Sequence, residues 1–155
     1  MWKILQWTAV AVLMTSGMTS FAGDSEQGET QSAIAELEKA ALTRWGNGDV
    51  FGYIELASED ISYFDPEQEK RLDGLAAFKE LLVPVQGKID IHRFEMPNWR
   101  VQLYGEVGIL TFNLVNYDSN DSVKTRWNST EVYHLENGEW KLVHSHWSLT
   151  EQGED

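Results

Sequence analysis

Asp65 and the pair His144 and His146 are the residues of this sequence best suited to acid–base chemistry. Asp65 follows Tyr63 and Phe64 and directly precedes a proline. A carboxylate beside aromatic rings is partly desolvated, which raises its pKa and makes it a usable general base near neutral pH. Together with a histidine it could move a proton at a carbon next to a carbonyl group. The alternative is structural, because an Asp-Pro step at a strand end commonly caps a turn.

The two histidines are separated by one residue in a run that reads as a strand, so they share a face of the predicted sheet. We expect His144 and His146 to point into the concave side of that sheet, where they could reach other polar groups. A His-x-His pair can also bind zinc, but such a site needs a third ligand. Asp65, Glu131 and His134 are of suitable types. We expect no metal and no cofactor; instead, one histidine could be a hydrogen-bonded core residue and the other could face solvent or a second copy.

Aromatic, amide and charged side chains on the predicted strands form a candidate ligand-binding set. Flat aromatic rings suit a hydrophobic or ring-shaped ligand, although they suit a dimer interface equally well. Arg126, beside a tryptophan, could clamp a ligand carboxylate or could form a surface salt bridge. The expected ligand is therefore a small hydrophobic or carboxylate-bearing molecule. The candidate residues are Tyr63, Trp99, Asn113, Arg126, Asn128 and Glu131.

Helical patterns occupy the first half of the chain. Apolar residues recur at three- and four-residue steps over residues 32–45, with Glu36, Glu38, Lys39 and Arg44 assigned to the other faces. A Gly-Asn-Gly run ends this helix, and Asp49 caps a second one. A third helix is predicted over residues 74–82. The residues expected to face inward in the first helix are Ile34, Leu37, Ala41 and Trp45.

Strand patterns dominate the second half. A short strand is predicted at residues 60–65, and four extended runs follow at residues 88–104, 107–117, 122–135 and 139–150. Asn137-Gly138 is a strong hairpin signal between the last two runs. In the last run, alternation places Trp140 and Leu142 on the same face as both histidines. Helices first and a meander last predict an α+β fold, with about three helices packed on one face of a strongly curved, mostly antiparallel sheet.

Composition limits the possible partners. The chain of 155 residues is long enough for one domain with a core. Its formal net charge of −13 argues against binding to nucleic acid and against docking on anionic lipid. Cysteine is absent, so stability must come from the core rather than from disulfides.

The chain divides into four parts. Residues 1–22 combine a lysine, an apolar run and a small-x-small end, which is typical of a secretory signal peptide cleaved after Ala22. We therefore expect a periplasmic or secreted protein, with no membrane association after cleavage. Residues 23–30 are predicted to form a flexible leader, residues 31–150 a single domain and residues 151–155 an acidic tail.

A set of short motifs occurs in a fixed order along the chain: Asn47-Gly48-Asp49, Phe64-Asp65-Pro66, Gly74 with Phe78, Thr130-Glu131-Val132, Asn137-Gly138-Glu139-Trp140 and the run from Val143 to Ser148. With this order of elements, the chain resembles the nuclear transport factor 2-like superfamily. Within it, the chain is most similar to SnoaL-like domains and to the association domain of calcium/calmodulin-dependent protein kinase II. The resemblance implies a cone-like fold with a deep pocket, and sheet-to-sheet dimers or larger rings. It does not imply kinase activity, because no kinase motif is present.

Three functions remain open at this point. The first is an exported small-molecule-binding protein with a pocket between the helices and the curved sheet, functioning as a dimer. The second is a cofactor-independent isomerase, dehydratase or hydrolase that uses Asp65 and a histidine. The third is an oligomerisation module. The fold alone does not choose among them, because this superfamily includes enzymes, binders and assembly domains.

Overall fold

The computed structural model describes residues 20–150. Three α-helices and a short 3₁₀ helix are present in this range: α1 (Ser20–Gly46), α2 (Phe51–Leu56), α3 (Leu75–Leu82) and η1 (Val83–Val85). Seven strands complete it: β1 (Ala57–Phe64), β2 (Leu72–Asp73), β3 (Arg93–Glu95), β4 (Arg100–Tyr104), β5 (Val107–Tyr117), β6 (Val123–Glu136) and β7 (Glu139–Leu149). No helix among the described residues is long and apolar enough to cross a membrane.

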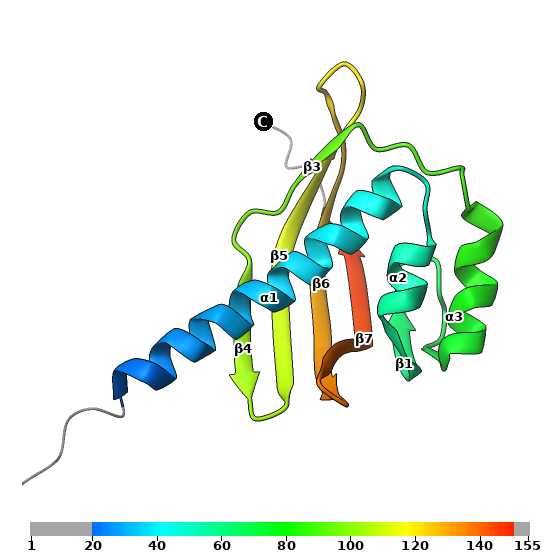
Figure 1. Cartoon of the computed structure of the whole chain (residues 1–155). Helices are drawn as coiled ribbons and strands as arrows, with labels where there is room; N and C mark the ends of the chain where they lie inside the picture. Colours follow the sequence, from blue (N-terminus) through cyan, green and yellow to red (C-terminus); the bar gives the residue numbers. More distant parts are fainter. Residues whose placement is uncertain (1–19, 151–155) are drawn as a thin grey trace, which may run out of the picture.

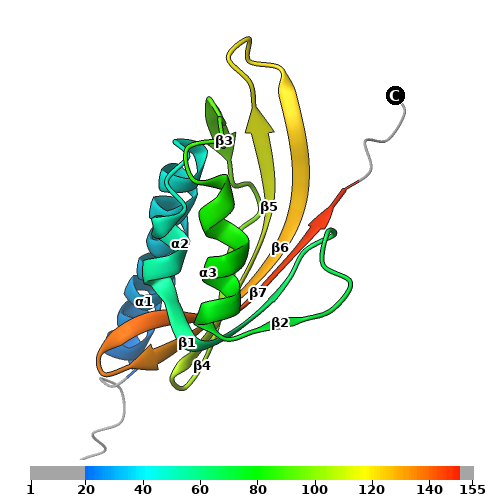
Figure 2. The ribbon, with the colours of Figure 1, turned by 90° about the vertical axis from the view of Figure 1, so that its right-hand side faces the viewer.

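The strands form one curved sheet in the order β2-β1-β7-β6-β5-β3, and β4 pairs with another part of β5. All pairs are antiparallel except β1 with β7. The three α-helices cover the same face of the sheet, and α1 runs diagonally across it (Figures 1 and 2). We call this helix-covered side the inner face and the opposite side the outer face. The predicted α+β fold, with helices on one face of a curved sheet, is confirmed.

Helix α1 anchors the helical layer to the sheet. Its apolar residues Ile34, Ala41 and Leu42 are buried, as the helical periodicity predicts for the first two. Ile34 packs so close to β5 that a Cβ at Gly108 would lie 2.5 Å from Ile34 Cδ1. Helix α1 also includes residues 23–30, for which the sequence predicted a flexible leader. Their polar composition disfavours burial, but it does not prevent them from continuing a helix.

Strand β7 contains a β-bulge that changes which side chains face inward. Val132 of β6 pairs with His144, and the next residue, Tyr133, pairs with Leu142. Val143 is therefore an extra residue on β7, and such an insertion reverses the alternation of side chains. As a result, Leu142 and residue 145 both face inward, whereas His144 faces outward. The predicted alternation, which put Leu142 and the histidines on one face, is wrong for this reason.

Candidate functional site

A cavity of about 450 Å³ lies between the helices and the inner face of the sheet. The helices, the ends of β1 and β7 and the central strands β5 and β6 all contribute to its lining. Most of the lining is apolar, and aromatic rings come from every one of these layers except β5. The aromatic residues of the wall are Trp45, Tyr53, Tyr63, Phe78, Trp127 and Trp147.

Two of these tryptophans, on neighbouring strands, are each held by the same kind of hydrogen bond within their own strand. The indole Nε1–H of Trp127 donates to Thr125 Oγ1 at 3.0 Å, and that of Trp147 donates to Ser145 Oγ at 2.9 Å. Each acceptor lies two residues earlier on the same strand, and therefore on the same face. The two rings meet edge to face, with centroids 6.3 Å apart and planes at 88°. Because both N–H groups are occupied, these indoles offer mainly their ring surfaces to a ligand.

Asp65 lines the cavity at the end of β1. Its Oδ2 accepts a hydrogen bond from the Tyr63 hydroxyl at 3.0 Å, and its Oδ1 accepts one from the Glu67 backbone N–H at 2.7 Å. The second bond is the turn-capping interaction that the sequence offered as an alternative role. The Tyr63 ring packs on Phe78 with centroids 5.2 Å apart. Burial and the neighbouring Asp65 carboxylate raise the pKa of Tyr63 far above its usual range, so this tyrosine remains a neutral donor.

Two fully buried carboxyl groups lie behind the cavity wall. Glu38 of α1 accepts hydrogen bonds from the hydroxyls of Tyr53, at 2.7 Å, and Tyr133. Glu131 accepts bonds at Oε1 from Ser129 and, at 3.2 Å, from Ser145. Its other oxygen, Oε2, is buried and has no hydrogen-bond partner among the described residues. Tyr53 and Ser145 themselves line the cavity, so each carboxyl group is one hydroxyl away from it.

Burial controls the ionisation of this pair. Desolvation raises the pKa of Glu38 from 4.5 to about 6, although its two tyrosine donors act in the opposite direction. Desolvation and the nearby Glu38 charge raise the pKa of Glu131 well above its ordinary value. Desolvation also raises the pKa of Tyr53 and Tyr133, so both hydroxyls keep their protons. Burial thus makes both carboxyl groups harder to ionise than an exposed glutamate.

A family model of the SnoaL-like domain matches residues 34–151. The chain belongs to the SnoaL-like domain family. A search of curated proteins gave no significant match.

Solved structures with the same fold include an isomerase-like protein and an assembly domain. A candidate ketosteroid isomerase from Parabacteroides distasonis is 35% identical, with a TM-score of 0.68; the match covers 76% of this chain and 86% of that one. An NTF2-like protein of unknown function from Pseudomonas putida is 22% identical, with a TM-score of 0.70 and coverage of 82% and 91%. The association domain of CaMKII from C. elegans is 20% identical, with a TM-score of 0.67 and coverage of 81% and 98%. The predicted membership of the NTF2-like superfamily is confirmed.

The two histidines do not lie in the cavity of this SnoaL-like domain. His144 Nδ1 is 2.8 Å from Ser62 Oγ, and the rings of His144 and His146 both pack near Phe64, with centroids 6.2 and 5.7 Å away. Ser145, between them, faces the cavity. The expectation that the histidines point into the cone is wrong, because the bulge at Val143 turns them to the outer face. Burial is the main cause that lowers the pKa of His144.

Four other predicted ligand-binding residues also lie away from the cavity. Asn113 Nδ2 donates to Asn128 Oδ1 at 2.7 Å on the outer face, because the alternate residues of β5 line the cavity instead. Arg126, on the same face of β6, is exposed to solvent. Trp99 is 41% exposed, with Lys39 Nζ 5.7 Å from its ring centroid. Their predicted placement in the pocket is wrong, so of the predicted residues the structure brings together only Tyr63 and Asp65, with Glu131 behind the wall.

Glu38 was assigned from the sequence to a polar face of its helix, although its spacing from the apolar residues indicates the buried face. The positions 34, 38, 41 and 45 follow one another at steps of four, three and four, so Glu38 lies on the apolar face of its helix. An isolated carboxylate on such a face must find hydrogen-bond donors, which here are tyrosines. No group of three or more metal-binding side chains occurs in the part of the chain that the structure describes.

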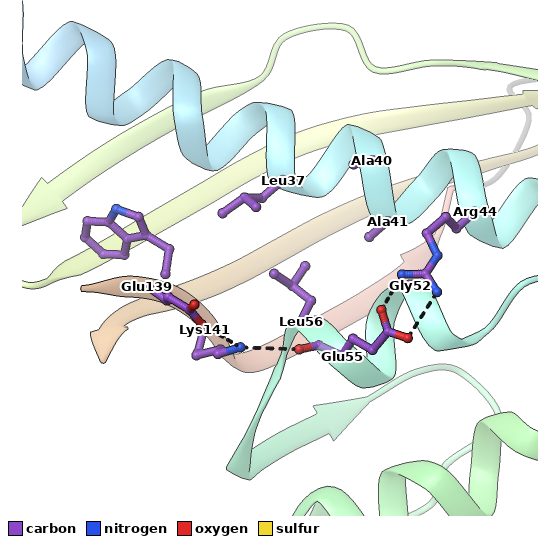
Figure 3. A pocket seen from close by; sticks show the side chains of 10 residues that line it. Leu37, Ala40, Ala41, Arg44, Gly52, Glu55, Leu56, Glu139 and Lys141 are labelled. Carbon is purple, nitrogen blue, oxygen red and sulfur yellow. Dashed lines mark hydrogen bonds and ion pairs between the residues drawn. The ribbon is translucent and has the colours of Figure 1, made fainter. Parts of the chain in front are cut away.

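A second hollow lies between α1, α2 and the start of β7 (Figure 3). It has a volume of about 470 Å³ and is more open to solvent than the cavity. Arg44 Nη1 pairs with Glu55 at 2.6 Å, and Lys141 Nζ lies 3.3 Å from Glu139 Oε2. Its charged groups thus neutralise one another in pairs. For this reason we assign the candidate site to the aromatic cavity, which is less open to solvent.

Proposed function

We propose that this SnoaL-like domain binds a small, largely apolar molecule in the cavity between its helices and its sheet. The observation that carries the proposal is an aromatic wall in which the indole N–H groups of Trp127 and Trp147 are already bonded inside the protein. The volume of about 450 Å³ lies within the ~300–1,000 Å³ that is usual for small-molecule sites. A few polar groups of the lining, among them Asp65, would orient the ligand.

Tryptophan fluorescence tests this proposal, because three of the cavity residues are tryptophans. The purified protein is titrated with a panel of ring compounds of different charge, and each binding compound is tested again by thermal shift. We expect saturable fluorescence changes that weaken in Trp147→Leu and persist in His146→Ala, a neighbouring change on the outer face. Binding that is identical in Trp147→Leu and the wild type, or a panel without any binding compound, would contradict the proposal.

The proposal also includes export and self-association. Export is supported by the signal-like pattern of residues 1–22, and fractionation of cells that produce the tagged chain tests it. Self-association is supported by the similarity to kinase association domains. The outer face of the sheet is the surface we assign to it, since the helices occupy the other face. Light scattering on the purified protein measures its mass, and a monomer at micromolar concentration would argue against this part.

A second candidate function is acid–base catalysis, such as a double-bond isomerisation. The specific observation in its favour is the Asp65 carboxylate inside an aromatic cavity, bonded by the neutral Tyr63 hydroxyl. The 35% identity to a candidate ketosteroid isomerase supports the same reading. A β,γ-unsaturated 3-ketosteroid tests it, because its conversion to the conjugated ketone changes the ultraviolet absorbance. Turnover that Asp65→Asn abolishes would establish the enzyme, whereas turnover unaffected by this change would exclude Asp65 as its base.

A further inference from the structure

Hydrogen-bond donors in the cavity wall are mostly used inside the protein. Three hydroxyl groups of the wall each donate to a carboxyl group: Tyr63 to Asp65, Tyr53 to Glu38, and Ser145 to Glu131. The indole N–H groups of Trp127 and Trp147 are used as well. A ligand that needs donors from this part of the wall would have to break these bonds. The cavity is therefore a poor site for a carboxylate or another anion.

Hydrogen-bond acceptors, in contrast, are left over. Asp65 is half-buried, and each of its side-chain oxygens accepts only one bond from the residues that the structure describes. An ionised carboxylate can accept about four bonds, so Asp65 retains capacity for a ligand. The Tyr53 oxygen donates its proton to Glu38 and keeps its own lone pairs. The charge inside the cavity is thus negative, with Asp65 in the wall and Glu38 directly behind it.

The remaining polar groups do not reverse this charge. Lys88 and Lys124 lie at the rim, where both are exposed to solvent and are accompanied by the exposed acids Glu67 and Asp90. Lys124 Nζ donates to the Asp90 backbone oxygen at 2.7 Å. Thr125 Oγ1, which also lines the cavity, accepts bonds from Asn116 Nδ2 and from the indole N–H of Trp127, so its own hydroxyl can donate. The Thr125 hydroxyl is uncharged and can donate to a polar group of a ligand.

We propose that the ligand of this cavity is an organic cation, an ammonium group carried on an apolar or ring-bearing body. The inference deepens the proposed function and rests on it. Asp65 supplies the counter-charge, and the aromatic wall supplies ring faces that attract cations. The formal net charge of −13 draws cations towards the protein and repels anions. This ligand class replaces the carboxylate that the sequence suggested, because Arg126, its expected partner, lies on the outer face.

Three probes of similar size and different charge test the proposal. They are benzyltrimethylammonium, its neutral carbon isostere neopentylbenzene, and the anion phenylacetate. Binding is measured by tryptophan fluorescence and by calorimetry at pH 7. We expect the cation to bind about tenfold more tightly than the neutral isostere, an effect of the size that ring faces and one partly buried carboxylate supply. Phenylacetate should bind more weakly than either.

Substitution of Asp65 then identifies the source of the preference. Asp65→Asn keeps the acceptor oxygen of the turn and removes the charge, so it should reduce the cation's advantage to the part that the ring faces supply and leave the neutral isostere unchanged. Glu80→Gln makes the same charge change at an exposed position on α3 and should alter nothing. Equal or tighter binding of the neutral or anionic probe would overturn the cation inference while leaving a binding cavity. Failure of all three probes, with the fold intact by circular dichroism, would overturn the proposed function and the inference with it.

Discussion

Replacement of Glu38 with glutamine tests whether a buried carboxylate destabilises this fold. The side chain is fully buried, and desolvation raises its pKa from 4.5 to about 6 in the folded protein. Well below pH 4.5 the group is protonated in both the folded and the unfolded chain, so it adds no pH-dependent term. As the pH rises to about 6, the unfolded chain releases the proton first, and the folded state loses stability. One pKa unit corresponds to ~1.36 kcal/mol, so the full loss is about 2 kcal/mol.

Urea denaturation of the wild type and Glu38→Gln from pH 4 to pH 7.5 measures this loss. Glutamine reorganises the bonds to Tyr53 and Tyr133, which adds an offset that does not depend on pH. The informative quantity is therefore the change with pH of the difference in unfolding free energy. We expect this difference to move by about 2 kcal/mol in favour of the variant between pH 4 and pH 7.

Glu29→Gln is the matched control, since Glu29 is an exposed acid on the same helix. Its difference from the wild type should remain flat over this pH range. A flat difference for Glu38→Gln as well would show that the carboxyl group is not buried as described. A change in the opposite direction would show that its tyrosine donors outweigh desolvation.

Three further substitutions give separate tests by urea denaturation. Gly108→Ala places a Cβ 2.5 Å from Ile34 Cδ1 and should cost ~1–3 kcal/mol through overpacking; Ile34→Val in the same background should recover part of that loss. Tyr133→Phe removes one of the two donors to the buried Glu38, so it should cost ~1–3 kcal/mol of unfolding free energy. Because this donor lowers the pKa of Glu38, its loss should raise that pKa and extend the pH-dependent loss of stability to higher pH. Glu131→Gln removes a group with a raised pKa, and its stabilising effect should grow as the pH rises; an effect that shrinks with pH would contradict the assignment.

Local patterns were sufficient to predict most elements of the fold, although the run predicted at residues 88–104 is two short strands, β3 and β4. Asn137 and Gly138 adopt φ values of 52° and 87°, which are the positive angles that the Asn-Gly turn signal requires. Helix α3 spans residues 75–82, where the apolar periodicity places it. The two-residue strand β2 was not predicted, because a segment this short has no periodicity of its own. Such a strand exists only because its partner, β1, provides hydrogen bonds.

The site was harder to predict because it depends on which face each strand turns inward. A period of two gives two equivalent faces, and one extra residue exchanges them. Val143 is that residue in β7, and nothing in its own chemistry marks it as a bulge. The same ambiguity applies to Asn113 and Asn128, which pair with each other on the outer face. Asp65 does not depend on this choice of face in the same way, since it lies just beyond the end of β1, where it lines the cavity.

The two buried carboxyl groups connect the stability of the fold to the candidate site. A carboxylate placed among apolar residues violates the usual rule for a core, and violations of this kind are expected mainly at functional sites. Glu38 and Glu131 are held there by hydroxyls that also line the cavity, so they reduce the number of donors a ligand can use. If their role were only structural, Glu38→Gln would gain stability without any change in ligand preference. If they supply the negative potential of the cavity, the same substitution should stabilise the fold and weaken the preference for a cation.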